Sequence, residues 1–270
     1  SMQMPAVALT DHGTLFGAVE FYSEAVKRNI NPIIGCEVYV AGEHRSQKRV
    51  DKYGKKYYHL VLLAKNTQGY HDLMKLVSAG YMEGFYYKPR VDKELLRQYA
   101  GNLIACSACL GGEIPQALIN RNPDRAHLIA QEYQSIFGKD NFFLEIQKHN
   151  IPEEKVVNPG IMDLSSKTGI PVVATNDFHY IYKEDWQAHE VLLCIGSSKK
   201  LTDESRKKYI PEKFSFTSPE EMQELFADYP EEVLTNTGYV ASMCSCEIHF
   251  PTKPLLPEYS LPEGYTSESY

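Results

Sequence analysis

The 270-residue sequence has no apolar run approaching the ~18–20 residues that a membrane-spanning helix needs, and no signal peptide precedes its first predicted strand. Its six cysteines do not form the pattern of a disulfide framework in a chain of this length. Cys106 and Cys109 make one Cys-x-x-Cys pair, but the chain has no second pair to complete a structural zinc knuckle. These absences lead us to expect reduced thiols, no membrane partner and a cytoplasmic location.

The chain also has fewer basic than acidic residues, and its net charge is −7. This negative balance argues against coating of the whole surface by nucleic acid. The charge is uneven, however: residues 44–56 carry a local charge of +5 and leave −12 for the remainder. This basic loop could contact a polyanion locally, and the alternative is a solvated, mobile loop. Since Val50 is its only aliphatic residue, we expect the loop to be poorly ordered in the isolated domain.

Strand-like and helix-like segments alternate from residue 6 to about residue 195. The candidate strands are short and rich in aliphatic residues: Ala6–Leu9, Ile33–Val40, His59–Ala64, Leu103–Cys106, Phe142–Ile146 and Val172–Thr175. One helical pattern has Leu15, Val19, Tyr22 and Val26 on a common face, and another, near Glu153–Lys167, contains Pro159 and should kink or break there. This alternation predicts an α/β fold with a mostly parallel sheet, open or closed into a barrel.

The first and last predicted strands both end in an acidic residue and a histidine. They lead into Asp11-His12-Gly13 and into Asp177-Phe-His179. Residues i and i+2 of an extended backbone point to the same face, so Asp177 and His179 can converge on one metal ion or phosphate. Strand-end capping is the alternative for this pair taken alone. Two such strands in one chain suggest a shared polar site at one end of a sheet.

Other predicted strands also carry metal-binding side chains near one end: Glu37, His59, Cys109, Glu145 and His149. The C-terminal strand ends of parallel α/β folds carry the active site, and only His59 departs from this rule, because it opens its strand. Imidazole, thiolate and carboxylate suit Zn²⁺, and carboxylate with imidazole also accepts Mn²⁺. Several such ions are typical of hydrolytic phosphoesterases. The alternatives are a small buried hydrophobic role for Cys109, an ion pair for Glu37 and a turn role for His149.

The remaining histidines lie in predicted helices or loops, and we assign them no ligand role: His44, His71, His127, His189 and His249.

Several motifs of the chain resemble, in order, those of the PHP (polymerase and histidinol phosphatase) superfamily. They are Thr10-Asp-His-Gly, Gly35-Cys-Glu-Val-Tyr, Tyr58-His-Leu-Val-Leu-Leu-Ala, Ala105-Cys-Ser-Ala-Cys-Leu-Gly-Gly-Glu-Ile and Ala174-Thr-Asn-Asp-Phe-His-Tyr. Three further segments are similar to the branch found in bacterial replicative polymerases, the DNA polymerase III alpha subunits: Glu83-Gly-Phe-Tyr-Tyr-Lys-Pro-Arg90, Glu145-Ile-Gln-Lys-His149 and Ser218-Pro-Glu-Glu-Met222.

The resemblance covers essentially the whole chain and implies a distorted, TIM-like β/α barrel with a multinuclear metal cluster. The ligand positions of the family fall on His12, Glu37, His59, Cys109, Asp177 and His179, of which Asp177, His12 and His179 would also be catalytic. Asp11, Arg90 and His149 are candidates to support these ligands or to contact phosphate. The implied cofactors are Zn²⁺ or Mn²⁺, with Mg²⁺ as a further candidate and as many as three ions in a complete domain. Only the resemblance makes His59 a ligand.

One part of the family pattern is absent from the sequence. The first motif, a His-x-His on the first barrel strand, and the acidic ligand after it do not occur, so the chain begins at what should be the second strand. We therefore expect an N-terminally truncated barrel that holds two ions at most and does not hydrolyse DNA until the missing segment is supplied. Glu37, Cys109, Asp177 and His179 should still lie close together at one end of the barrel.

The sequence is expected to divide into three parts. Residues 1–195 would form the barrel core, residues 196–250 a polymerase-type extension, and residues 251–270 a Pro-rich linker toward an absent palm domain. In the extension, Ser218 at N-cap, Pro219 at N1 and Glu221 at N3 predict a helix with a capping box, and a second helix is predicted from Glu231 to Met243. The prolines of the linker indicate a stiff connector, which a polymerase would use and a self-contained phosphatase would not need.

The resemblance implies the PHP domain of a DNA-directed DNA polymerase, a nucleotidyltransferase of DNA replication whose catalytic carboxylates lie outside this sequence. The domain itself would be either a metal-dependent 3′–5′ exonuclease that proofreads or a metal-stabilised scaffold without catalysis. The implied partners are DNA primer-template, other replisome subunits and the rest of the alpha subunit, reached through the linker. The enzyme alternative is a stand-alone PHP phosphatase that acts on a small phosphate ester.

Overall fold

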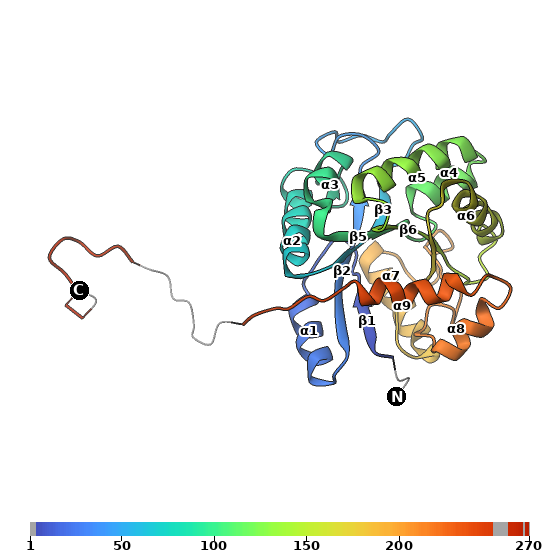
Figure 1. Ribbon diagram of the computed structural model, residues 1–270. Coiled ribbons are helices and arrows are strands. Elements are labelled where there is room, and N and C mark those ends of the chain that lie inside the picture. The colour runs from blue at the N-terminus through green and yellow to red at the C-terminus, as the bar shows by residue number, and fades with distance from the viewer. Residues whose placement is uncertain (1–3, 251–258, 267, 270) are drawn as a thin grey trace.

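The computed structural model describes residues 4–250, 259–266 and 268–269, and the strands of this part form one sheet curled into a partial barrel (Figure 1). Within these residues the sheet has seven strands in the order β1-β2-β3-β5-β6-β7, with β4 paired to β2. The bounds are β1 Ala6–Leu9, β2 Asn31–Val40, β3 Tyr58–Ala64, β4 Arg90–Val91, β5 Leu103–Cys106, β6 Phe142–Ile146 and β7 Val172–Ala174. The predicted α/β barrel-like architecture is confirmed.

The observed strands match the predicted ones to within two residues, because short aliphatic runs bounded by turn residues are a strong signal. Strand β4 was not predicted, since two residues leave no alternating pattern to detect. The sheet is mostly parallel, as expected, with one exception. Strand β3 runs antiparallel to both of its neighbours, β2 and β5, which changes the end of the sheet at which its first residues lie.

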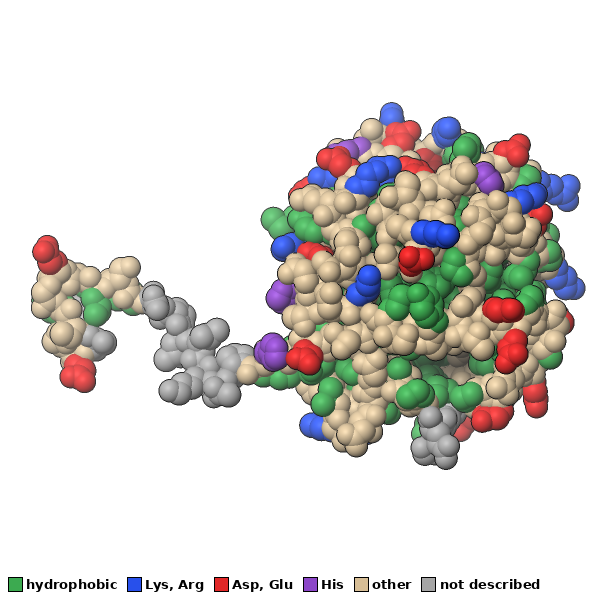
Figure 2. Space-filling model, viewed as in Figure 1, with side chains coloured by type: hydrophobic (Ala, Val, Ile, Leu, Met, Phe, Trp, Pro, Cys, Tyr) green, Lys and Arg blue, Asp and Glu red, His purple; other side chains and the backbone are tan. Residues whose placement is uncertain are grey.

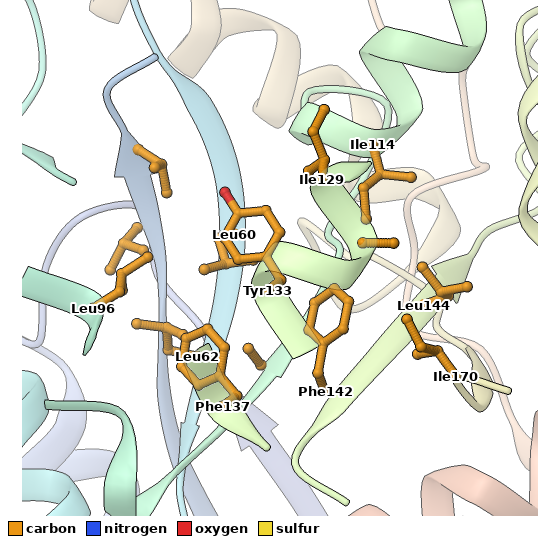
Figure 3. Close-up of a cluster of buried hydrophobic side chains, with 14 of the residues drawn as sticks. Leu60, Leu62, Leu96, Ile114, Ile129, Tyr133, Phe137, Phe142, Leu144 and Ile170 are labelled. Atoms are coloured by element: carbon orange, nitrogen blue, oxygen red, sulfur yellow. The ribbon is translucent and has the colours of Figure 1, made fainter. Parts of the chain in front are cut away.

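Helices cover the outer face of the sheet and form the larger hydrophobic core. They are α1 Ala18–Lys27, α2 Thr67–Met82, α3 Lys93–Tyr99, the 3₁₀ helix η1 Ala100–Asn102, α4 Glu113–Ile119, α5 Pro123–Phe137 and α6 Glu154–Thr168. Figure 3 shows Leu60 and Leu62 of β3 facing Tyr133 and Phe137 of α5 across this core. Alternate residues of each strand point to this face, so the intervening residues point to the inside of the barrel.

The inner face of the sheet packs against the C-terminal helix α9 Glu232–Ser242, and the preceding helix α8 Pro219–Leu225 lines the cavity beside it. Ile33, Leu63 and Phe143 form the inner cluster with Val240 of α9. The side-chain amide of Asn236 donates a hydrogen bond of 2.7 Å to the carbonyl oxygen of Val172, which fixes α9 to β7. A cavity of about 1170 Å³ lies between these helices and the sheet, and it reaches the strand ends that carry the predicted ligands.

Most helix predictions are confirmed, with differences in detail. Helix α8 has the predicted capping box, since the Ser218 hydroxyl accepts from the Glu221 amide and the Glu221 carboxylate accepts from the Ser218 amide. Helix α9 lies within the predicted segment. Helix α6 stays a single helix through Pro159, so of the predicted kink or break the break is not observed. The chain between β7 and α8 also contains η2 Lys183–Asp185 and α7 Trp186–Ser197.

The first helix is buried through its small residues rather than through the larger ones that mark its helical pattern. Helix α1 buries Ala18 and Ala25, whereas Val19 and Val26 are nearly half exposed. Small residues let the helix approach the sheet closely, and this packing overrides the pattern of larger aliphatic residues. In the part of the chain that the structure describes, no helix is long and apolar enough to span a membrane. Residues 251–258 of the predicted linker lie outside the described residues.

The basic loop between β2 and β3 has defined contacts, contrary to the prediction of poor order. Arg45 is almost buried and pairs with Asp92 at 3.0 Å and with Glu83 at 2.7 Å. The guanidinium of Arg90 donates to the carbonyl oxygens of Arg45 and Gln47. The loop lies at the top of Figure 1, and Figure 2 shows acidic as well as basic side chains along that edge. Composition within the loop could not reveal these partners, because they belong to distant segments.

Candidate metal centre

Glu37 and His59 come together because β2 and β3 are antiparallel. The register pairs Tyr39 with His59 and Glu37 with Val61, so Glu37 and His59 are diagonal neighbours on the inner face. The Nδ1 atom of His59 donates a hydrogen bond of 2.5 Å to Oε1 of Glu37. His59 opens its strand, but the antiparallel direction brings it to the end where its parallel neighbours close. The departure of His59 from the strand-end rule is thereby explained.

His12 joins this pair by extending the parallel ladder of β1 and β2. A single bridge pairs His12 with Glu37 in the register of that ladder, and His12 Nδ1 lies 3.4 Å from Glu37 Oε2. Gly13 follows with φ of +65°, and a Cβ atom there would lie 2.9 Å from the Tyr39 ring. The tight turn after His12 therefore requires glycine. The ligand atoms of His12, Glu37 and His59 all lie within 4.8 Å of one another.

Cys109 approaches the same group from the turn after β5. Its Sγ atom lies 3.6 Å from Glu37 Oε1 and 3.6 Å from His59 Nδ1. Gly111 permits this approach, because a Cβ atom there would meet the His59 ring at 3.1 Å. Tetrahedral Zn²⁺ with ordinary bond lengths separates neighbouring ligand atoms by roughly 3.3–3.6 Å. The separations of Cys109 from Glu37 and His59, and of His12 from Glu37, fit such an ion, for which the direct hydrogen bond between His59 and Glu37 would have to open.

Asp177 and His179 lie in the turn after β7 and face the same cavity. Asp177 adopts a left-handed backbone conformation with φ of 51°, and His179 Nδ1 donates to the Asp177 carbonyl oxygen at 2.8 Å. This hydrogen bond places the proton on Nδ1 and leaves Nε2 of His179 with a free lone pair for a ligand. The rings of His12 and His179 lie 6.2 Å apart, so the turn after β7 adjoins the first group.

Burial controls the ionisation of these ligands. It raises the pKa of Asp177 to about 7, with a further contribution from the negative charge of Glu37. It also raises the pKa of the Cys109 thiol and lowers the pKa values of His12 and His179. Glu37 differs: burial acts to raise its pKa, but the hydrogen bond from His59 and the charges of both imidazoles lower it overall. Burial therefore favours neutral His12 and His179, as a cation needs, whereas Cys109 and Asp177 must lose protons to bind one.

Glu145 connects the two turns that carry Cys109 and Asp177. Its Oε2 atom accepts from the Ala108 amide at 3.0 Å, and its Oε1 atom accepts from the Thr175 hydroxyl at 2.5 Å and from the Gln147 amide at 2.9 Å. Burial, together with the nearby charge of Asp177, raises the pKa of Glu145 to about 7. Glu145 thus links the backbone before Cys109 to the Thr175 side chain before Asp177.

His149 lies behind the turn of Asp177 rather than in the ligand group. Its Nε2 atom donates to the Asn176 carbonyl oxygen at 2.7 Å, and its Nδ1 atom donates to Glu154 at 3.0 Å. Burial opposes the charged form, but these two acceptors outweigh it and raise the pKa of His149. Its ring stacks on Phe214 at 4.3 Å. His149 therefore supports the backbone that precedes Asp177.

The other two supporting candidates differ in their placement. Asp11 is exposed at the rim of the cavity, and its carbonyl oxygen accepts from the Glu37 amide at 3.1 Å. Arg90 is 2% exposed and lies outside the lining of that cavity. Its guanidinium donates to the carbonyl oxygens of Gly84, Lys56, Arg45 and Gln47. The structure therefore brings Asp11 to the site and does not bring Arg90 there.

A second group of potential ligands is His44, Asp92 and Glu94. Arg45 already occupies its carboxylates, since the guanidinium lies 3.0 Å from Asp92 and 3.7 Å from Glu94. A permanent cation in this position competes with a metal ion for the same oxygens. The geometry therefore favours the group around Glu37.

Sequence reasoning missed residues that surround His179. The rings of His189 on α7, Tyr209 and Phe214 lie 5.4, 5.0 and 5.4 Å from the His179 ring. His189 was expected to be structural or solvent-facing because it lies in a helical pattern. The segment that carries Tyr209 and Phe214 is polar and charged, and no periodicity linked it to the site. Its contact with β7 is set by the amide of His179, which donates to the Phe214 carbonyl oxygen at 2.8 Å.

Comparison with known proteins agrees with this geometry. DNA polymerase III subunit alpha of Treponema pallidum is 46% identical over 270 residues, which is 100% of this chain and 23% of that protein. The proteins of the same name from Thermus aquaticus and Borreliella burgdorferi are each 46% identical and are covered to 22% and 23%. The chain thus spans less than a quarter of these curated relatives. The sequence profile of the PHP domain matches residues 1–149, more than half of the chain, which therefore belongs to the PHP domain family.

Proposed function

We propose that the chain is the PHP portion of a DNA polymerase III alpha subunit, and that its cluster binds Zn²⁺ or Mn²⁺ for hydrolysis of phosphate esters at DNA 3′ ends. The observation that carries this proposal is the convergence of an imidazole pair, a thiol and a shared carboxylate at one strand end. A site of this composition suits a borderline cation. The identity of 46% over the whole chain supports the parent protein.

Each residue has a role in this proposal. His12, Glu37, His59 and Cys109 hold the first ion, and Asp177 with His179 extends the site toward the cavity. When bound, a divalent cation supplies a Lewis acid that neutralises charge on the phosphate ester. Asp177, whose pKa burial raises to about 7, would lose its proton on binding the cation, which links metal loading of the site to neutral pH. Glu145 and His149 keep the turn of Asp177 in place.

A nuclease assay tests the catalytic part of this proposal. A 5′-labelled single-stranded oligonucleotide is incubated, without dNTPs, with the full-length gene product and Mn²⁺ or Zn²⁺, while the metal content is measured in parallel. We expect loss of 3′ nucleotides that Asp177→Asn and His12→Ala abolish. His71→Ala is the matched control, because His71 is an exposed helical histidine away from the site. A small phosphate ester in a parallel arm tests a stand-alone phosphatase.

A metal-stabilised scaffold is the second candidate, and the connections of Glu145 favour it. One buried carboxylate ties the turn after β5 to the turn after β7, so an ion beside it would lock the strand ends together. Full metal occupancy without release of any nucleotide would assign the cluster to this role.

Polymerisation and the partners of a replisome belong to the whole parent protein in this proposal. Primer extension by the full-length gene product, with all four dNTPs, tests them. We expect extension by that product and none by the 270-residue chain alone. A full-length gene product that binds metal but extends no primer would contradict assignment to a polymerase.

A further inference from the structure

We propose that Lys207 and Tyr209 form an anion subsite at the mouth of the cluster, which binds a phosphate group beside His179. Lys207 Nζ donates a hydrogen bond of 2.7 Å to the Tyr209 hydroxyl, and this hydroxyl lies 3.5 Å from Nε2 of His179. The Lys207 ammonium, the Tyr209 hydroxyl and the His179 nitrogen thus lie in a row in space. This inference rests on the proposed function, because it names the group that the site would recognise.

The charge of Lys207 faces the site without a counter-ion. Among the residues that the structure describes, no carboxylate lies within 4.0 Å of its ammonium group. Its positive charge nevertheless reaches Asp177 and the rings of His12 and His179. Burial has the largest effect, raising the pKa of Asp177 and lowering the pKa values of His12 and His179, and Lys207 adds a small lowering to each. A cation held next to neutral imidazoles and metal ligands provides a place for an anion.

The neighbouring contacts explain why Lys207 and Tyr209 point to this place. Arg206 forms two parallel hydrogen bonds of 3.0 and 3.1 Å with Glu190 on α7, which anchors the chain one residue before Lys207. On the other side, the Tyr209 ring packs edge-on against Phe214 at 4.6 Å. Phe214 in turn stacks on the buried His149. The segment is therefore fixed at both ends, and its two polar tips meet at His179.

The donor set identifies the class of ligand. An ammonium group is a point charge suited to phosphate oxygens, and a tyrosine hydroxyl can donate a further hydrogen bond. The Tyr209 hydroxyl lies 3.5 Å from His179 Nε2, which is long for a hydrogen bond, so the hydroxyl can turn and donate to a bound anion instead. The ligand is therefore a phosphate group, either free or as the diester of a nucleic-acid chain.

Binding of inorganic phosphate to the metal-free protein tests the subsite by ³¹P NMR titration. We expect saturable binding that Lys207→Gln weakens about tenfold and Tyr209→Phe weakens by a smaller factor. Lys208→Gln is the matched control, because Lys208 is the adjacent exposed lysine and should leave the affinity unchanged. Equal affinities of the Lys207→Gln and Lys208→Gln variants, or no saturable binding by the unaltered protein, would overturn the proposal.

Two further arms complete the design. In the first arm, a short oligothymidylate replaces inorganic phosphate. If Lys207→Gln weakens binding of both the oligothymidylate and inorganic phosphate, the ligand is a phosphodiester. If it weakens binding of inorganic phosphate alone, the ligand is a free phosphate. Zinc titration of the same variants separates this inference from the metal site. Unchanged zinc affinity with lost phosphate affinity supports the subsite. Retained phosphate binding in a protein that binds no zinc would leave the subsite standing and contradict only the proposed cofactor.

Discussion

At the residue scale, Glu145 is the buried acid with the clearest consequence for stability. Its pKa is raised from 4.5 to about 7, mainly by burial, so the folded protein favours the protonated form. The associated stability is present below about pH 4.5 and is lost as the pH rises toward 7. Asp177, raised from 3.8 to about 7, acts in the same direction. The metal-free protein should therefore become less stable between about pH 4 and pH 7.

Glu145→Gln tests this account, because glutamine resembles the protonated acid in shape and carries no charge. We expect the variant to match the unaltered protein near pH 4.5 and to exceed its free energy of unfolding at pH 8. Urea unfolding at several pH values measures the difference. An equal or steeper loss of stability with pH in the variant would show that Glu145 does not carry this ionisation.

The sequence allowed all six candidate ligands to be named, five of them from their positions at strand ends. It could not assign the supporting roles. Glu145 and His149 were visible as polar residues, but their functions depend on hydrogen bonds to the turns of Cys109 and Asp177. Lys207 and Tyr209 lie in a segment without periodicity, and only its pairing beside β7 brings them to His179.

At the scale of elements, the direction of β3 is what places His59 in the cluster. The alternating pattern of the strand shows which residues share a face, but it does not show that the strand runs antiparallel to both of its neighbours. Helix α8 is the opposite case, since its local signals sufficed to predict its start.

Replacing Ser218 by alanine should remove the hydroxyl that accepts from the Glu221 amide at 3.1 Å. We expect a loss of about 1 kcal/mol in the free energy of unfolding, measured by urea titration. Ser135→Ala is the control, because Ser135 is exposed within α5 and caps no helix. A loss of equal size in both variants would indicate a general effect of serine rather than the capping box.

The β2–β3 loop connects the two strands at the same end as the cluster, so its charges could meet DNA there. Replacing Lys48, Arg49 and Lys52 with glutamine should weaken binding of single-stranded DNA. The slope of log affinity against log salt should fall by up to about 2, because fewer phosphates are neutralised. The control replaces three lysines at the other end of the sheet with glutamine. These lysines precede strands, and they are Lys27, Lys139 and Lys167. Equal effects of both sets would leave only non-specific attraction.

At the scale of the whole molecule, the curled sheet gathers six strands around one cavity, and α9 covers its inner face. The alternation of strands and helices predicted this architecture. It could not predict the cavity or the packing of α9, because both depend on side chains more than 150 residues apart in sequence, such as Ile33 and Val240.

Metal binding should be linked to protons through this buried site. Cys109 and Asp177 both have raised pKa values, so a cation must displace protons from them near neutral pH. We expect zinc affinity to increase from pH 6 to pH 8, with release of about one or two protons. Calorimetry in two buffers of different ionisation enthalpy measures that number. Affinity that is independent of pH would exclude Cys109 and Asp177 as ligands.

The central claim is that a divalent cation binds among His12, Glu37, His59 and Cys109. Anomalous diffraction at the zinc edge, from crystals of the protein equilibrated with Zn²⁺, tests it most directly. The account predicts a peak about 2.0–2.3 Å from a Glu37 oxygen, a His59 nitrogen and the Cys109 sulfur. A peak at His44, Asp92 and Glu94 instead, or no peak at saturating Zn²⁺, would contradict it.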